Sequence, residues 1–254
     1  MRFASLGSGS QGNALLVQAG RTTVMVDCGF GLRDCVGRLQ RLGLEPDALN
    51  AILVTHEHGD HIDGVARFSG RYGTPVWATH GTARHFSEDH ALPLQHIDGY
   101  QPFSIGDLQI TPFPVPHDAS EPAQFVLGDG NHRLGVLTDA GSVTPHMVDM
   151  LSGLDALFLE CNHDEQRLRA NTSYPPSLIE RVAGAYGHLS NDGAADLLRR
   201  VGHSELQHVV AAHLSQQNNA PELARAALAA ALDCDERWIG VADQALGLDW
   251  RSIS

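Results

Sequence analysis

Residues 55–61 read Thr-His-Glu-His-Gly-Asp-His, so three imidazoles and two carboxylates stand within one short segment. The segment directly follows the apolar run 51–54, a pattern typical of a buried strand that ends in a loop of ligands. His56 and His58 are two positions apart, so both can face one side where the extended chain ends. Burying so dense a polar cluster without a cation would be costly. The residues therefore predict a metal site.

The spacing His56-x-His58-x-Asp60-His61 resembles the HxHxDH signature of the metallo-β-lactamase superfamily. The resemblance implies an α/β fold, a four-layer αββα sandwich that carries two divalent metal ions. We expect a single domain over residues 1–254, because no linker or low-complexity stretch interrupts the chain. We also expect no inserted β-CASP domain.

Three later residues each end an expected strand and resemble the superfamily's remaining ligand motifs in order: His117, Asp139 and His213. The resemblance implies that one metal ion is bound by His56, His58 and His117. It implies that the other is bound by Asp60, His61 and His213. Asp139 would bridge both ions, and a site of nitrogen and oxygen ligands alone suits zinc, manganese or iron. Taken alone, a histidine at a strand end is more often capped or solvated, so the order of the motifs carries this prediction.

Further stretches narrow the family. The glycine- and serine-rich segment 5–13, the segment 159–164 and the pair 187–191 and 212–219 resemble the YycJ/WalJ family, which lies near RNase J, tRNase Z and PhnP. Asp27 matches the superfamily's first motif, which implies that it holds loop groups and ligands in position. The alternative is that Asp27 caps a strand-to-helix turn, which is nearly the same structural role.

Several residues beside the expected metal site are candidates for contact with substrate. In tRNase Z-like relatives a histidine before a helix protonates the leaving oxygen, and His188 occupies the matching place; capping of the helix is the alternative. Ser190 and Asn191, at the start of that helix, are candidates for holding phosphate oxygens. For Asn162 and His163 a substrate contact and a structural role both stay open. Three arginines are expected near the approach: Arg167, Arg169 and Arg181.

The resemblance implies a metal-dependent phosphodiester hydrolase, foremost a 5′-exonuclease that acts on DNA. A hydroxide between the metal ions, beside Asp60 and Asp139, would attack phosphorus, and His188 would act as the acid. One alternative is a small-substrate hydrolase, either a cyclic nucleotide phosphodiesterase or a glyoxalase-type thioesterase. The other is a non-catalytic regulator stabilised by metal.

Composition excludes some chemistry. All 17 basic residues are arginine, so lysine nucleophiles, Schiff bases and P-loop chemistry are impossible. The net charge of −13 argues against a surface that coats nucleic acid and gives some support to a small substrate. Four scattered cysteines and the lack of an apolar leader or membrane span predict a cytoplasmic protein with reduced thiols. No obligate protein partner can be inferred.

The elements that must position these residues follow from periodicity and turn signals. Strands are expected at 14–19, 22–27, 51–55, 75–79, 124–127, 133–138, 156–160, 209–212, 238–241 and 248–250. The segment 108–115 contains prolines and is expected as an edge strand or a loop-bound strand. Helices are expected at 32–42, after the histidine loop with Ile62, Val65 and Phe68 on its apolar face, at 82–88, at 194–200 and after Pro221.

Overall fold

Two seven-stranded sheets organise the computed structural model, which describes residues 1–86, 92–202 and 204–254. The first sheet has the strand order β14-β1-β2-β3-β4-β5-β6. Its strands are β1 (Arg2–Gly7), β2 (Ala14–Ala19), β3 (Thr22–Val26), β4 (Ala51–Leu53), β5 (Val76–Thr79), β6 (Leu94–Ile97) and β14 (Leu248–Ser252). The β1–β2–β3 meander is antiparallel, whereas β3, β4, β5 and β6 run parallel.

The second sheet has the strand order β13-β12-β11-β10-β9-β8-β7. Its strands are β7 (Phe103–Ile105), β8 (Leu108–Pro114), β9 (Ala123–Gly128), β10 (Arg133–Leu137), β11 (Ala156–Glu160), β12 (His208–Ala212) and β13 (Gly240–Val241). From β10 to β13 the strands are parallel, and β11 is buried along its whole length. A parallel strand covered on both faces reads as a continuous apolar run, which is why this strand could be predicted.

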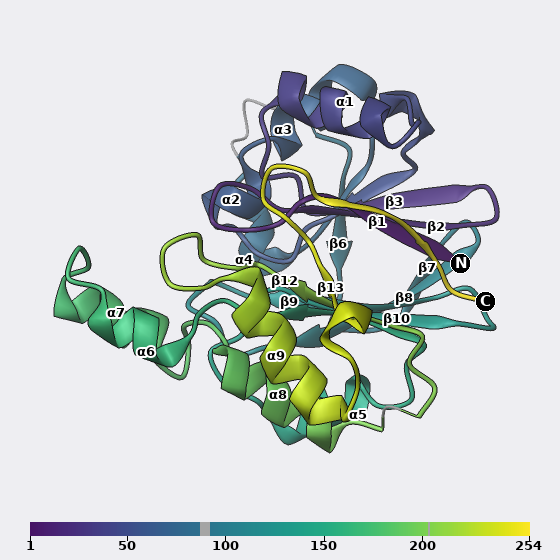
Figure 1. Cartoon of the computed structure of the whole chain (residues 1–254). Coiled ribbons are helices and arrows are strands. Elements are labelled where there is room, and N and C mark those ends of the chain that lie inside the picture. Colours follow the sequence, from purple (N-terminus) through teal and green to yellow (C-terminus); the bar gives the residue numbers. More distant parts are fainter. Residues whose placement is uncertain (87–91, 203) are drawn as a thin grey trace.

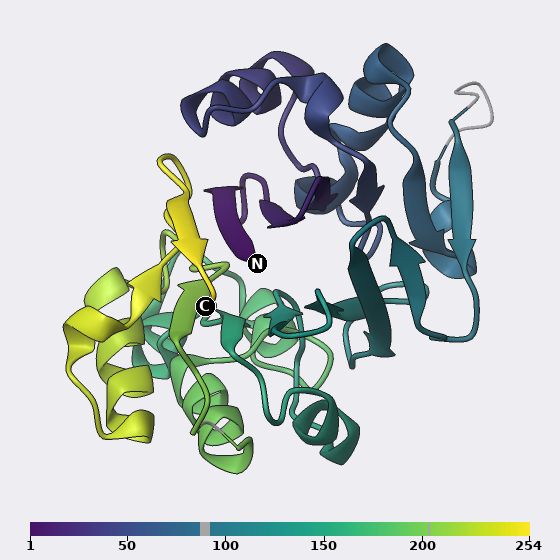
Figure 2. The ribbon, with the colours of Figure 1, turned by 90° about the vertical axis from the view of Figure 1, so that its right-hand side faces the viewer.

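Helices cover the outer face of each sheet (Figures 1 and 2). They are α1 (Leu32–Arg41), α2 (Gly59–Ile62), α3 (Val65–Tyr72), α4 (His80–Ala83), α5 (Pro145–Met150), α6 (Glu165–Ala170), α7 (Pro176–Val182), α8 (Asn191–Arg200) and α9 (Pro221–Leu232). Phe125 and Phe158 are buried between the sheets, Phe68 lies in the core beneath α1 and α3, and Leu197 and Leu228 lie beneath α8 and α9. These three apolar layers confirm the predicted αββα sandwich.

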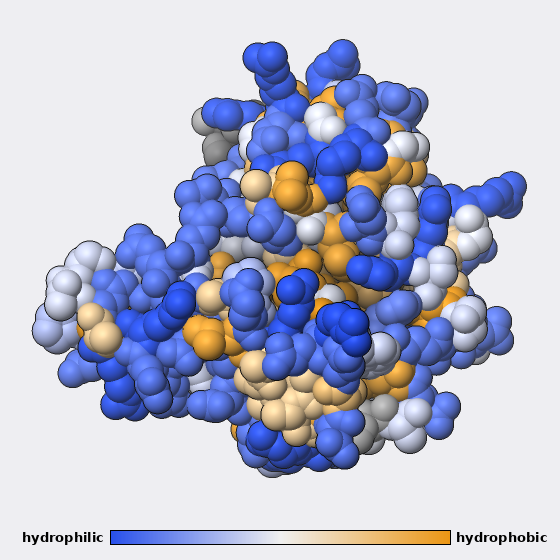
Figure 3. All heavy atoms as spheres, in the orientation of Figure 1, coloured by the Kyte–Doolittle hydropathy of each residue, from blue (hydrophilic) through white to orange (hydrophobic). Residues whose placement is uncertain are grey.

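Helices α6 and α7 form an arm that projects from the body beside the edge where α4 lies (Figure 1). On the face shown in Figure 3 the arm is mostly hydrophilic. Within the described part of the chain, no helix is long and apolar enough to cross a membrane.

The expected single helix after the histidine loop is wrong, because the chain forms the two short helices α2 and α3 instead. The break falls at Gly64. A Cβ atom there would collide with the backbone oxygen of Phe30 and the side chain of Cys28, so the close approach of this segment requires glycine. The apolar face was predicted correctly, since Val65 and Phe68 are buried.

The prediction of an edge strand at 108–115 is also wrong, because β8 pairs with both β7 and β9. The prolines are nevertheless placed as their missing N–H groups require. β7 pairs only with residues 108–110, so Pro112 and Pro114 lie beyond the part of β8 that it covers.

Other boundaries differ as well. The helix expected at 82–88 is instead the single turn α4 (His80–Ala83), and residues 87 and 88 lie outside the described residues. The strand expected at 238–241 is shorter, since Trp238 belongs to a 3₁₀ turn, Glu236–Trp238, and β13 begins at Gly240. The short strands β6 and β7 were not predicted.

Candidate metal centre

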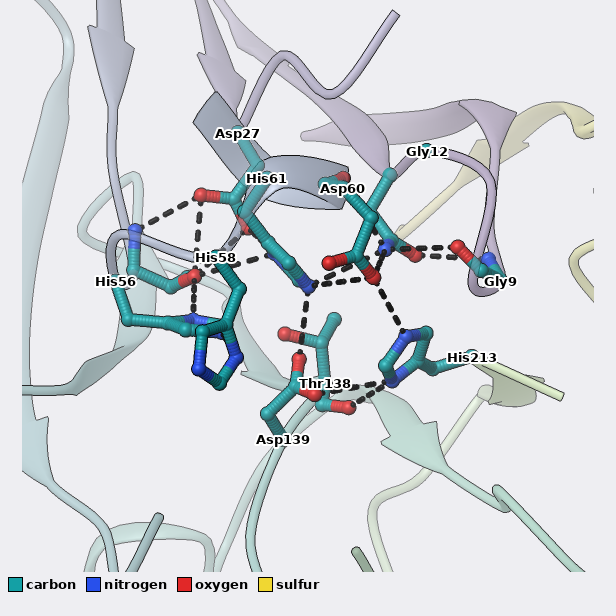
Figure 4. A network of polar contacts seen from close by, with 12 residues as sticks. Gly9, Gly12, Asp27, His56, His58, Asp60, His61, Thr138, Asp139 and His213 are labelled. Carbon is teal, nitrogen blue, oxygen red and sulfur yellow. Dashed lines mark hydrogen bonds and ion pairs between the residues drawn. The ribbon is translucent and has the colours of Figure 1, made fainter. Parts of the chain in front are cut away.

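The predicted ligands converge where the carboxyl ends of strands from both sheets meet. Parallel strands end at the same edge of a sheet, so residues far apart in sequence come together there. The loop 54–58 and helix α2 follow β4, and single residues follow β8, β10 and β12. Figure 4 shows several of these side chains directed toward a common centre. The seven predicted ligands that meet there are His56, His58, Asp60, His61, His117, Asp139 and His213.

Three imidazoles form a first triad. The Nδ1 atom of His58 lies 3.0 Å from Nε2 of His56 and 3.2 Å from Nε2 of His117. One nitrogen from each ring lies within 4.8 Å of the other two, a spacing that can hold a metal ion. His56 and His117 are buried, and the His58 side chain is 31% exposed. This is the ligand set that the sequence resemblance implied for one ion.

A second triad lies beside the first. Oδ2 of Asp60 is 3.5 Å from Nε2 of His61 and 3.2 Å from Nε2 of His213 (Figure 4). Asp139 stands between the triads: its Oδ2 is 3.1 Å from Nε2 of His61 and its Oδ1 is 3.9 Å from Nε2 of His117. The structure thus places the predicted bridging carboxylate where it faces both sets.

Hydrogen bonds fix which nitrogen four of the five imidazoles turn to the centre, whereas His58 turns its Nδ1 atom inward. Nδ1 of His61 is 2.7 Å from an Asp27 carboxylate oxygen, and Nδ1 of His117 and His213 are each 2.9 Å from backbone oxygens. Thr55 donates its one hydroxyl proton to Asp27, so it accepts from Nδ1 of His56. Since these partners are acceptors, Nδ1 carries the proton and Nε2 offers its lone pair to the centre, the arrangement typical of metal-binding histidines.

The donor set fits a cation. Both oxygens of the buried Asp139 carboxylate lack a hydrogen bond of acceptable geometry within the described residues, although histidine nitrogens lie near them. Nε2 of His56 and Nδ1 of His58 face each other at 3.0 Å, and two lone pairs at that distance need a proton or a metal ion between them. The residues present fit divalent metal ions.

Charge within the cluster supports the same interpretation. Burial lowers the pKa of His56, which keeps this imidazole neutral as a ligand must be. Burial opposes the charge on Asp139, but His213 and His61 hold its pKa well below the usual range. Burial also lowers the pKa of His61, yet Asp139 and Asp27 raise it well above its ordinary value. Protons here balance the carboxylates, a role that bound cations would take over.

Asp27 orients the ligands as expected from the sequence. It is 1% exposed and accepts hydrogen bonds from the backbone N–H and the hydroxyl of Thr55, in addition to Nδ1 of His61. Its φ is 61°, and that of His213 is 53°, so both non-glycine residues occupy the left-handed region. Such a conformation is uncommon and persists where the surroundings determine it, often at functional sites.

His188 lies at the rim of the cluster, and sequence reasoning missed the residue that holds it. Its Nδ1 is 2.7 Å from Oε1 of Glu160, a fully buried carboxylate that also accepts from the backbone N–H groups of Ala140 and Leu189. Burial lowers the pKa of His188, but Glu160 and Asp139 raise it to about 9. Within the described residues Nε2 of His188 makes no hydrogen bond. The signal in the sequence was an acidic residue that ends an otherwise apolar run.

Asn13, in the glycine- and serine-rich loop, was also missed. Its Nδ2 lies 3.2 Å from Nε2 of His61 and 3.3 Å from Oδ2 of Asp60, beside two ligand atoms. Spacing gave no signal for it, because the residue is far from the histidine motif in sequence.

The predicted neighbours of the site have different surroundings. Asn162 lines the cavity in front of the metal ligands and donates to the backbone oxygen of His213. Ser190 caps α8 by accepting from the N–H of Gly193. Asn191 is buried and pairs with Asn219, so its amide is used within the fold. His163 lines a second cavity on the other side of His188.

A cavity of about 210 Å³ leads to the metal ligands. Leu178, Arg181 and Val182 of α7 form one wall of it. Nε of Arg181 lies 2.6 Å from Oδ2 of Asp118, which ties the arm to the loop after β8. Of the three arginines expected near the approach, this one lines the cavity, Arg169 lines the second cavity, and Arg167 donates to the backbone oxygen of Asn219.

This fold and this ligand set have counterparts among known proteins. A model of the beta-lactamase superfamily domain matches residues 22–214. The solved structure of the metallo-beta-lactamase fold protein YhfI from Bacillus subtilis superposes with a TM-score of 0.76 at 17% identity, covering 98% of both chains.

Two relatives are similar along nearly their whole length. Exodeoxyribonuclease YycJ of Bacillus anthracis is 33% identical over 249 residues, which cover 96% of this chain and 92% of the relative. Exodeoxyribonuclease WalJ of Streptococcus pneumoniae is 31% identical over 249 residues, covering 94% of this chain and 91% of the relative. The chain belongs to the beta-lactamase superfamily and, within it, to the YycJ/WalJ family, as the motifs predicted.

Proposed function

We propose that this protein is a metal-dependent phosphodiester hydrolase that degrades DNA from its 5′ end. The observation that carries the proposal is the pair of ligand triads with a shared carboxylate, in a chain that aligns almost completely with relatives named exodeoxyribonucleases. Many nucleases and phosphatases use two metal ions to stabilise the attacking and the leaving oxygen at the phosphate.

One ion would be held by His56, His58 and His117, the other by Asp60, His61 and His213, and both by Asp139. The nitrogen and oxygen donors suit zinc, manganese or iron. When bound, such ions would lower the pKa of a water molecule and offset the charge that develops on the phosphate. Asp60, whose side chain is 24% exposed at the cavity, would accept a hydrogen bond from that water and orient it.

His188 would supply the proton that the leaving oxygen needs. Glu160 binds its Nδ1, so Nε2 is the atom left to donate. Without bound metal ions, Glu160 and Asp139 outweigh burial and raise the pKa of His188. Glu160 belongs to neither triad, so its carboxylate would still favour the protonated imidazole when metal ions are bound. Arg181 and Asn162, which line the same cavity, would hold the phosphate that is attacked.

We further propose that residues 1–254 act as one domain in the cytoplasm, without a β-CASP insertion. Support comes from the two core layers on the outer faces of the sheets, which flank one layer between the sheets that both halves of the chain share. No protein partner is part of the proposal.

The test is release of nucleotides from duplex DNA that carries a 5′ phosphate and a 3′ label, in the presence of manganese. Wild type should shorten the labelled strand stepwise from the 5′ end, and Asp60→Ala should not. Asp63→Asn, an exposed neighbour outside the triads, is the matched control and should behave as wild type. RNA of the same sequence in a parallel reaction tests the preference for DNA. Hydrolysis of bis-p-nitrophenyl phosphate without any cleavage of DNA would overturn the nuclease and favour a small phosphodiester.

A further inference from the structure

A second cavity, of about 390 Å³, lies on the other side of His188 from the metal ligands. His188 lines both cavities and is the one residue that they share. The second cavity is bounded by the segment 141–143, by α6 and by one side of α8 from Gly193 to its last residue, Arg200. Its volume lies in the range of sites for small molecules such as nucleotides.

His163 gives this cavity an unsatisfied polar group. The side chain lines the cavity and is 2% exposed, and its Nδ1 atom is buried without a hydrogen-bond partner in the described part of the chain. Buried polar atoms are nearly always paired in folded proteins, so an unpaired one in a residue that lines a cavity marks His163 as a candidate for contact with a ligand. Ser142 and Ser190 place further hydroxyl groups on the same wall.

Two arginines stand at the rim. Arg169 is 3.4 Å from Glu165 and Arg200 is 3.5 Å from Asp196, each pair one helical turn apart and exposed. Exposed pairs of this kind are weak, and each engages one nitrogen of a guanidinium group that has five N–H donors. Glu165 and Asp196 line the cavity as well, so a bound anion would compete with these carboxylates for guanidinium donors whose planar arrangement suits phosphate.

The bond that breaks in the proposed reaction determines which part of the substrate would reach this cavity. Water gives its hydroxyl to phosphorus and a proton to solvent, and the bond from phosphorus to the 3′ oxygen breaks. That oxygen takes a proton from His188, which regains one from solvent. The terminal nucleotide leaves with a 3′ hydroxyl, and the shortened strand keeps a 5′ phosphate. Because His188 separates the two cavities, the departing nucleotide lies on the side away from the metal ligands.

We propose that the second cavity binds the 5′-terminal nucleotide of the substrate, with its terminal phosphate on Arg169 and Arg200 and its nucleoside against His163. The inference rests on the proposed function. It assigns the cavity a ligand class, a nucleoside 5′-monophosphate, and it makes Arg169 and Arg200 recognition residues for a phosphorylated end.

The first test is equilibrium binding of thymidine 5′-monophosphate to the metal-loaded protein, measured by calorimetry. The double substitution Arg169→Gln, Arg200→Gln should raise the dissociation constant at least tenfold. Arg199→Gln, an exposed neighbour that does not line the cavity, should leave the constant unchanged. Equal affinity in all three proteins would overturn the inference, because the nucleotide would then bind elsewhere, for instance by its phosphate at the metal ions.

A second variant blocks the cavity without removing charge. Gly193 lines it, has ordinary helical φ, and a Cβ there would meet its nearest neighbours at 3.4 Å or more, so a larger side chain fits the helix. Gly193→Leu should abolish nucleotide binding while circular dichroism stays that of wild type. Retained binding in this folded variant would contradict the assignment.

The second test compares DNA with a 5′ phosphate and DNA with a 5′ hydroxyl. Wild type should have the lower KM for the phosphorylated end, and the double variant should lose this preference while Arg199→Gln keeps it. If wild type degrades both ends equally and the calorimetric affinities do not differ, the inference fails and the exonuclease stands. If no DNA is degraded but the nucleotide still binds through Arg169 and Arg200, the exonuclease fails and the nucleotide site stands.

Discussion

The two halves of the metal centre are built differently. The half from the first sheet is compact, because His56, His58, Asp60 and His61 come from one short segment after β4. The half from the second sheet is distributed, because each of its residues follows or ends a different strand; they are His117, Asp139, Glu160 and His213. A local turn can preorganise the first half, whereas the second exists only once β8, β10, β11 and β12 are in register.

The halves also differ in how their imidazoles are oriented. In the compact half the Nδ1 atoms of His56 and His61 bond to side chains, those of Thr55 and Asp27. In the distributed half the Nδ1 atoms of His117 and His213 bond to backbone oxygens. A point mutation can remove the first kind of support but not the second, so the compact half is the one whose ligand orientation depends on single side chains.

The largest expected effect comes from the residue that joins the halves. Asp139→Asn keeps the shape of the side chain but weakens a ligand that faces both triads, so metal content should fall and hydrolysis should drop roughly a thousandfold or more. Mass spectrometry of bound metal, together with the rate on bis-p-nitrophenyl phosphate, measures both. Full metal occupancy at wild-type rate would show that the halves bind their ions independently.

Removal of the acid from the distributed half should affect turnover alone. His188→Gln should lower kcat roughly 10²- to 10⁴-fold, since the amide that replaces the imidazolium cannot supply a proton. His188 lies outside the two triads but also forms a further group of potential ligands with Asp139, Glu160 and His213. Metal content should nevertheless match wild type, because the Nδ1 atom that faces this group is bound to Glu160. Loss of metal in this variant would instead make His188 part of the ligand set and remove the distinction between acid and ligands.

The same difference explains what the sequence could predict. Four ligands and an orienting carboxylate were predicted from short motifs, and the strands that carry His117, Asp139 and His213 were predicted from apolar runs. Glu160 was missed, because an acidic residue at a strand end is common and only the register of β11 against β10 and β12 brings it to His188. The break at Gly64 depends on the backbone of Phe30, a tertiary contact that periodicity does not contain.

Orientation by a side chain can be tested in the compact half. Asp27→Asn weakens the acceptor that binds Nδ1 of His61 and Thr55, so metal affinity should fall roughly 10- to 100-fold. Competition with a chromogenic chelator measures the change, and Asp63→Asn serves as control. An unchanged affinity would mean that the loop after β4 needs no carboxylate to hold its ligands, and that the hydroxyl of Thr55 and the backbone suffice.

The smallest effect concerns the pH dependence set by the distributed half. Without bound metal ions, Glu160 and Asp139 outweigh burial and raise the pKa of His188 to about 9, and a cation beside Asp139 would offset part of this rise. Only the imidazolium donates a proton, so kcat should be full below this pKa and fall up to tenfold per pH unit as the pH rises through it. Glu160→Gln removes one carboxylate that raises the pKa, so the alkaline limb should move to lower pH while metal content stays unchanged. If the alkaline decrease in kcat falls at the same pH in Glu160→Gln as in wild type, the decrease reflects the titration of a group other than His188. The buried carboxylate of Glu160 would then only support the fold of the distributed half.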